Sequence, residues 1–182
     1  MNINKKQFLK DWVVPVFLAI AVALLIKQYL FLSVYVPSTS MVPTINKWDK
    51  LIVTRIYNTE NIERGNIIVF NSDELGKRLV KRVIGLPGDH IVIHDGITNI
   101  NGTDIKEDYV KNNEKYDGVF DVPEDKFFFL GDNRANSCDA RRWNNPYIDK
   151  EDIQGKAIFR FYPFDNLGFL IYCTDYLQQG MY

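Results

Sequence analysis

One long apolar run near the N-terminus constrains this chain more than any other feature. No charged residue occurs between Trp12 and Ile26, and after Lys27 the apolar character resumes in YLFLSVYV. A helix that extended to Leu32 would be roughly 30 Å long, which matches the apolar thickness of a bilayer. The run therefore predicts a transmembrane helix over residues 12–32.

A cleaved signal peptide and a buried core helix are the competing interpretations of this run. A cleaved signal peptide ends in small residues, whereas this run passes into aromatic and β-branched residues, so an uncleaved anchor is favoured. Lys5, Lys6 and Lys10 precede the run. By the positive-inside rule, residues 1–11 are expected in the cytoplasm and residues 33–182 outside the cell membrane.

The composition of the chain excludes several classes of function. The formal net charge is −1, so there is no basic surface to attract nucleic acid. Cys138 and Cys173 lack zinc-ligand spacing, and His90 and His94 belong to the strand-like segment HIVIH. We therefore expect no metal and no cofactor, and a Ser-His-Asp triad is poorly supplied.

The chain beyond residue 44 consists of short β-branched or aromatic segments separated by turn sequences such as LPGD, HDG and NGT. Residues 101–123 are polar and predict a hairpin or surface loop. The tail from Leu167 could be a helix or a strand. The predicted fold is mainly β, with one transmembrane helix followed by an all-β domain over residues 33–182. The predicted strands are 50–57, 66–70, 78–85, 90–94, 126–131 and 157–164.

Three segments combine polar side chains in patterns that suggest catalysis. They are VPSTSMVPT (36–44), KRVIGLPGD (81–89) and GDNRANSCDARRW (131–143). A serine hydroxyl is a weak nucleophile unless a base takes its proton, and without a convincing histidine a lysine can serve as the neutral amine. Because a free lysine has a pKa near 10.4, burial must lower that pKa by about 3 units.

Lys81 and Arg82 are neighbours in a predicted strand, and side chains alternate between the two faces of a strand. The two side chains should therefore point in opposite directions. We expect one of them to lie in a dry pocket and the other to face water.

Together with the anchor, and in the same order, these segments resemble the bacterial type I signal peptidases, membrane-anchored serine proteases that remove signal peptides from exported proteins. The resemblance covers nearly the whole chain, whose compact size is similar to the short, single-anchor forms common in Gram-positive bacteria. It implies an endopeptidase that cuts after a small-x-small motif. Ser40 would be the nucleophile and neutral Lys81 the general base.

The resemblance also implies roles for residues around this pair. The Ser38 hydroxyl would join the Ser40 backbone N–H in the oxyanion hole, and Thr39 would face away. Ser137 would orient the lysine amine, while the site would be supported by a charged pair. That pair is Asp139 and Arg141. The shallow apolar pockets for the substrate would be lined by Val34, Val36, Met41, Ile45 and Val80.

Five positions depart from the family pattern without removing a catalytic group. They bear on the shape of the site and therefore on rate and specificity. Ala135 stands where an acidic residue is common, Ala140 where serine is common, Asn144 and Trp48 where glycine is usual, and Asn66 where aspartate is usual.

The implied partners are signal-peptide-bearing preproteins, the lipid bilayer and the secretion translocon. A catalytically silent homologue that binds signal peptides is the alternative, although Ser40 and Lys81 are both present. Self-cleaving Ser/Lys repressors of the DNA-damage response are a second alternative, but this chain contains no Ala-Gly or Cys-Gly dipeptide and begins with an anchor. Cys138 as a rival nucleophile lacks a base nearby in the sequence.

Overall fold

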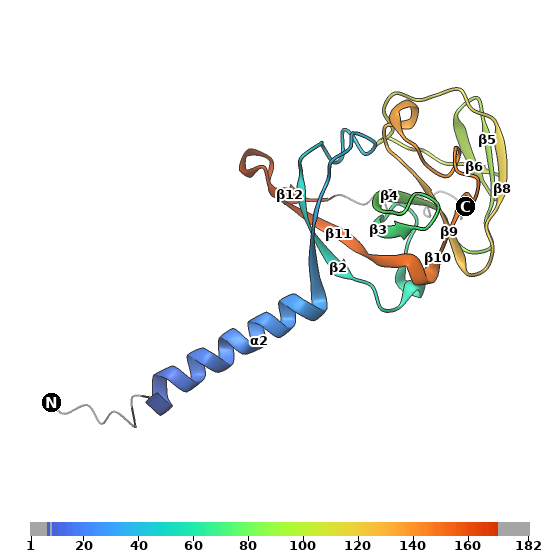
Figure 1. Ribbon diagram of the computed structural model, residues 1–182. Helices are drawn as coiled ribbons and strands as arrows, with labels where there is room; N and C mark the ends of the chain where they lie inside the picture. Colours follow the sequence, from blue (N-terminus) through green and yellow to red (C-terminus); the bar gives the residue numbers. More distant parts are fainter. Residues whose placement is uncertain (1–6, 8, 171–182) are drawn as a thin grey trace, which may run out of the picture. The chain divides into compact units, whose positions relative to one another are not determined.

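The computed structural model describes residue 7 and residues 9–170. They fall into two compact units, divided between Leu32 and Ser33. The first unit is helical and the second consists mainly of strands (Figure 1). The mainly-β fold predicted from the sequence, with one N-terminal apolar helix, is confirmed.

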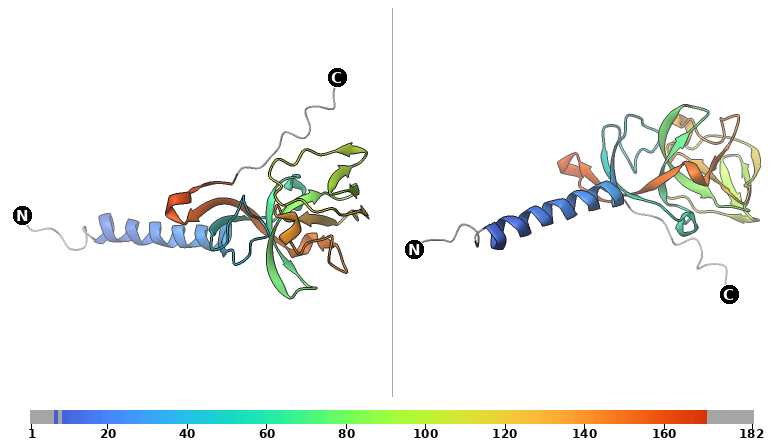
Figure 2. Two further views of the ribbon diagram at one scale, coloured as in Figure 1. Left: turned by 90° about the horizontal axis from the view of Figure 1, so that it is seen from above. Right: turned by 60° about the horizontal axis from the view of Figure 1, so that its bottom comes forward.

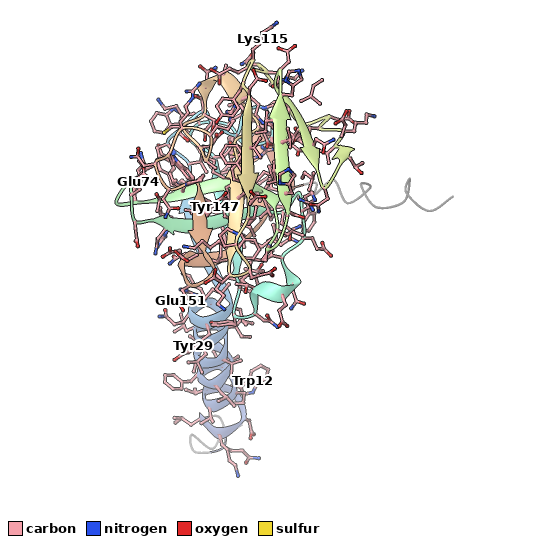
Figure 3. All side chains as sticks on the ribbon, turned by 90° about the vertical axis from the view of Figure 1, so that its right-hand side faces the viewer. Trp12, Tyr29, Glu74, Lys115, Tyr147 and Glu151 are labelled. Atoms are coloured by element: carbon pink, nitrogen blue, oxygen red, sulfur yellow. The ribbon has the colours of Figure 1, made fainter. Side chains whose placement is uncertain are left out.

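The helical unit contains a π-helical turn, Leu9–Val13, which leads directly into helix α2, Val14–Leu30. This 22-residue segment contains an 18-residue window with a mean hydropathy of 2.2. The side chains of Trp12 and Tyr29 project outward from this segment (Figure 3). The segment is long and apolar enough to cross a membrane.

The helix differs from the predicted span of residues 12–32 at both ends. It begins at Leu9 and ends at Leu30, and Phe31–Tyr35 forms strand β1. Aromatic and β-branched side chains fit an extended strand better than a helix. The apolar run is therefore shared between two kinds of secondary structure.

The second unit is built from two sheets (Figure 2). The strand order is β1-β2-β11-β3-β4-β9-β10 in the larger sheet, with β12 paired to β11, and β7-β6-β5-β8 in the smaller one. The strands after β1 are β2 Lys50–Arg55, β3 Ile67–Ser72, β4 Lys77–Gly85, β5 His90–His94, β6 Ile97–Ile100, β7 Thr103–Asp104, β8 Gly118–Asp121, β9 Lys126–Leu130, β10 Tyr147–Asp149, β11 Ile153–Tyr162 and β12 Gly168–Phe169.

The polar excursion and the tail both contain short strands, in line with the hairpin and the strand that the sequence left open for them. The excursion 101–123 contains β7 and β8. In the tail, Phe169 of β12 pairs with Phe159 of β11. The remainder of the tail, including Cys173, lies outside the described residues.

One hydrophobic core joins the two sheets. Phe70 of β3 and Phe129 of β9 are fully buried and stack with ring centroids 4.3 Å apart. Ile91 and Ile93 contribute from the smaller sheet to the same cluster. Each such side chain stabilises the fold by roughly 1.5–3 kcal/mol relative to its exposed state. Strand β4 contributes Val83 and Ile84 to this core, and its second half, residues 81–85, is buried.

Candidate active site

Strand β4 places Lys81 in the protein interior. The strand lies between β3 and β9, and Lys81 is opposite Ile68 of β3. Its side chain is 3% exposed, and Nζ donates a hydrogen bond of 3.0 Å to Ser137 Oγ. Burial lowers the pKa of Lys81 to about 8, although the nearby charge of Asp139 acts in the opposite direction. A large fraction of the amine is therefore neutral in mildly alkaline solution.

The serine-rich segment forms a turn after β1. Ser40 is buried, whereas Ser38 and Thr39 are exposed, as expected for Thr39. The hydroxyl oxygens of Ser38 and Ser40 are 3.3 Å apart. Val42 N donates to the Thr39 carbonyl at 3.2 Å, which closes the turn. The turn therefore orients two hydroxyls toward each other and the intervening one outward.

The segment after β9 holds this turn in place. Asn133 donates from its backbone N to the Ser40 carbonyl and from Nδ2 to the Thr39 carbonyl, both at 3.0 Å. Gly131 lies between Ser40 and Ser137. A Cβ at this position would clash with Ser137 Oγ and would lie 2.5 Å from the Ser40 carbonyl oxygen. Only glycine permits this approach, which brings two predicted site residues together.

Asp139 and Arg141 form the predicted charged pair. Arg141 donates from Nε to Asp139 Oδ1 at 2.9 Å and from Nη2 to Oδ2 at 3.0 Å, and both side chains are buried. Asp139 Oδ2 also accepts from the backbone N of Gly131 at 3.0 Å. This two-bond ion pair therefore fixes the glycine between the two serines.

The prediction that either Lys81 or Arg82 faces water is wrong. Arg82 is 1% exposed, and it donates to the two carboxylate oxygens of Asp132 at 2.8 and 2.6 Å. Its Nη1 donates to the Gly65 carbonyl at 2.8 Å, and its guanidinium lies 3.9 Å from the ring centre of Tyr109. These partners replace the water that a buried guanidinium loses.

A groove of about 300 Å³ lies beside the two predicted catalytic residues. Of the predicted pocket residues, Val34, Val36 and Val80 line it, whereas Met41 and Ile45 are 1% and 0% exposed and lie in the core. The complete lining is Ser33, Val34, Tyr35, Val36, Pro37, Ser38, Ser40, Lys77, Arg78, Leu79, Val80 and Lys81.

The five residues that depart from the family pattern have different environments. Trp48 adopts a φ of 78°, in the left-handed region that favours glycine, and stacks on Tyr35 at 5.5 Å. Asn66 is fully buried, and its Nδ2 has no hydrogen-bond partner. Ala135 and Asn144 are exposed. Ala140 is buried, and its backbone N donates to the Phe129 carbonyl at 3.3 Å.

The two histidines lie outside this arrangement, whereas Cys138 lies next to Ser137 and Asp139 in the sequence. His90 and His94 are exposed and lie 2.6 and 2.9 Å from Asp121 and Asp117. Cys138 is exposed. Within the described part of the chain, no group of three His, Cys, Asp or Glu side chains is arranged to hold a metal ion.

Comparisons with known proteins assign the chain to a class. Residues 9–162 match the family of signal peptidases, peptidase S26. A signal peptidase I from Bacillus licheniformis is 36% identical over 90% of this chain and 94% of its own length. Signal peptidase I P from Bacillus subtilis subsp. natto is 38% identical over the same shares. For a signal peptidase I from Leptolyngbya laminosa the identity is 39%, over 83% of this chain and 78% of that protein.

A crystal structure of a signal peptidase I from Enterococcus faecalis V583 is 34% identical, with a TM-score of 0.47, and the match covers 53% of this chain and 96% of that chain. The matched family defines a class of peptidases, so the protein is a hydrolase. The chain belongs to the signal peptidase family, peptidase S26, which removes signal peptides from preproteins. The resemblance seen in the sequence is thereby confirmed.

Proposed function

We propose that this protein is an endopeptidase that cuts preproteins after a small-x-small motif, with Ser40 as nucleophile and neutral Lys81 as general base. The observation that carries the proposal is the environment of Lys81, whose amine is buried and hydrogen-bonded to Ser137 at 3.0 Å. Burial lowers the pKa of this amine to about 8. A base with such a pKa is half neutral at about pH 8 and still accepts a proton readily.

The proposed reaction follows the chemistry of an activated serine. Lys81 Nζ takes the hydroxyl proton as Ser40 Oγ attacks the scissile carbonyl, and the resulting ammonium returns this proton to the leaving amine. Water, deprotonated by the same amine, then attacks the acyl carbon, and the ammonium gives this proton to Ser40 Oγ as the ester bond breaks. The Ser38 hydroxyl and the Ser40 backbone N–H stabilise the oxyanion. Ser137 keeps the amine in place throughout.

The groove supports the proposed preference for small side chains. Val34, Val36 and Val80 line it together with Ser40. Met41 and Ile45 are buried in the core and are not among its lining residues. Branched apolar side chains in a cavity of about 300 Å³ leave room for alanine-sized residues at alternate positions of an extended substrate.

The proposed location follows from the helical segment Leu9–Leu30. Spanning the cell membrane once, with residues 1–11 in the cytoplasm, it would leave residues 33–182 on the outer side. Ser40 follows the helix by few residues, so a substrate anchored in the same bilayer would be concentrated near the site. The lipid bilayer and the secretion translocon are the partners that this location implies.

The test is cleavage of a preprotein with an Ala-x-Ala signal by the full chain in detergent. We expect one cut after the second alanine, detected by mass spectrometry. Ser40→Ala and Lys81→Ala should abolish it, while Thr39→Ala is the matched control and should cut normally, since its hydroxyl is exposed. A wild-type protein that binds the preprotein without cutting it would establish the silent homologue instead. Normal cleavage by Lys81→Ala would exclude this lysine as the base.

A further inference from the structure

The excursion predicted as a hairpin or surface loop contacts the catalytic segment directly. Its backbone pairs with the segment after β9: Lys111 N donates to the Asp132 carbonyl at 2.8 Å, and Arg134 N donates to the Lys111 carbonyl at 3.0 Å. Tyr109 packs against the hydrophobic core. The Glu107 side chain is only 8% exposed. The groove is lined by other residues, so the excursion contacts the catalytic segment without lining the groove.

Glu107 is the centre of a buried hydrogen-bond network. Its Oε1 accepts from Arg134 Nη2 at 2.5 Å and from the Tyr109 hydroxyl at 2.7 Å, and its Oε2 accepts from Thr98 Oγ1 at 2.9 Å. Arg134 is 2% exposed, and its Nε donates to the Gly131 carbonyl at 3.2 Å. The carboxylate therefore compensates the charge of an arginine that fixes the glycine between Ser40 and Ser137.

Tyr109 reaches the site by a second route. Its ring covers the guanidinium of Arg82 at 3.9 Å. Arg82 holds both carboxylate oxygens of Asp132, and Asp132 Oδ2 also accepts from Thr44 Oγ1 at 2.5 Å. Thr44 belongs to the segment that carries Ser40. Glu107 and Tyr109, which are hydrogen-bonded to each other, therefore contact two successive residues indirectly. Glu107 reaches Gly131 through Arg134, and Tyr109 reaches Asp132 through Arg82.

We propose that Glu107 and Tyr109 are positioning residues for peptide-bond cleavage. They hold Gly131 and Asp132, and through them the Ser40 carbonyl and the Ser137 hydroxyl, in register with Lys81. This inference rests on the proposed function of Ser40 and Lys81. Because neither residue lines the groove, their loss should lower kcat and leave KM nearly unchanged.

Glu107→Gln removes the charge and leaves the Arg134 guanidinium buried without its carboxylate. We expect kcat for the Ala-x-Ala preprotein to fall by about tenfold or more, since small displacements of reacting groups are costly. KM should stay within about twofold of wild type. Tyr109→Phe keeps a ring against Arg82 and should retain more activity than Tyr109→Leu, which removes the ring. If Glu107→Gln does not fold, the comparison of Tyr109→Phe with Tyr109→Leu tests the positioning role by itself.

Two controls separate positioning from a general loss of stability. Lys106→Gln changes an exposed neighbour in the same excursion and should behave as wild type. Ile93→Ala removes a buried side chain of the smaller sheet and should lower Tm at least as far as Glu107→Gln, with kcat unchanged below both melting temperatures.

The outcomes are distinct. A fall in kcat confined to the Glu107 and Tyr109 variants, graded from Phe to Leu, supports the inference. A wild-type kcat in Glu107→Gln or in Tyr109→Leu overturns it. The inference is also overturned if Ile93→Ala, which lowers Tm to a similar extent, lowers kcat as much as Glu107→Gln does. An inert wild-type protein would instead overturn the proposed function, and this inference with it.

Discussion

At the scale of single residues, Gly131 shows how closely the site is packed. A Cβ at this position would meet the Ser137 hydroxyl and the Ser40 carbonyl at once. Neither can move freely, because Ser137 binds Lys81 and the Ser40 carbonyl accepts from Asn133 N at 3.0 Å. The absence of a side chain here is therefore a requirement of the site rather than of a turn.

Gly131→Ala should therefore inactivate the enzyme. We expect kcat/KM to fall by about a hundredfold, the scale of a misplaced catalytic geometry, and stability to fall by about 1–3 kcal/mol from overpacking. Gly168→Ala is the matched control, since a Cβ there meets nothing within 4 Å. Cleavage assays and thermal melts of both variants measure the effects. Near-normal activity of Gly131→Ala would show that Ser40 and Ser137 tolerate separation.

Lys81 carries a cost to stability that a neutral residue would remove. Its pKa of about 8 in the fold, against an ordinary 10.5, corresponds to about 3 kcal/mol. Lys81→Met should therefore stabilise the protein by about 2 kcal/mol, allowing about 1 kcal/mol for the hydrogen bond lost by Ser137. The lysine is charged in both states below about pH 8, so the gain is complete there. It should fade as the pH rises toward 10.5.

Denaturant unfolding in detergent at pH 6, 8 and 10.5 measures this difference. Ser40→Ala, which changes no titrating group, is the control and should show no such pH dependence. A Lys81→Met protein that is less stable than wild type at pH 6 would contradict the burial cost.

At the scale of elements, β4 explains why the prediction that either Lys81 or Arg82 faces water is wrong. Side-chain alternation separates Lys81 from Arg82, but it does not reveal that both faces of β4 are covered. Arg82 is buried because Asp132 and Tyr109 come to it from distant parts of the sequence. Such compensation is invisible in a local pattern.

Arg82→Lys tests the importance of this bidentate contact. A lysine cannot donate in parallel to both oxygens of Asp132. We expect kcat to fall by about tenfold and stability by about 2 kcal/mol. Arg55→Lys, at an exposed position of β2, should change neither quantity. Equal kcat in Arg82→Lys and wild type would mean that only the charge at this position matters.

The sequence was informative where chemistry is local and silent where contacts are remote. Six predicted strands correspond to β2, β3, β4, β5, β9 and β11. The three polar segments could be recognised from their residues alone. In contrast, the helix end at Leu30 and the short strands β6, β10 and β12 depend on pairing with neighbours. The contacts of Glu107 and Asn133 exist only in the folded chain.

At the scale of the whole molecule, one chain joins an apolar helix to the unit that carries Ser40 and Lys81. If enzyme and preprotein share a bilayer, each searches a plane rather than a volume. Co-reconstitution in one vesicle population should therefore speed cleavage by about a hundredfold over enzyme and preprotein in separate vesicles. Dissolving both samples in detergent is the control and should equalise the rates. Equal rates in intact vesicles would mean that the helix does not concentrate the substrate.

The most direct test of a neutral Lys81 acting as base is the pH dependence of kcat/KM for the Ala-x-Ala preprotein. Only the deprotonated amine can accept the Ser40 proton, so activity must rise with pH through the pKa of Lys81 in the free enzyme. The expected acidic limb has an apparent pKa of about 8, where burial places this amine. A limb near 6.5, the value of an ordinary histidine, or a rate that stays constant between about pH 6 and 9, would contradict the assignment of Lys81 as the base.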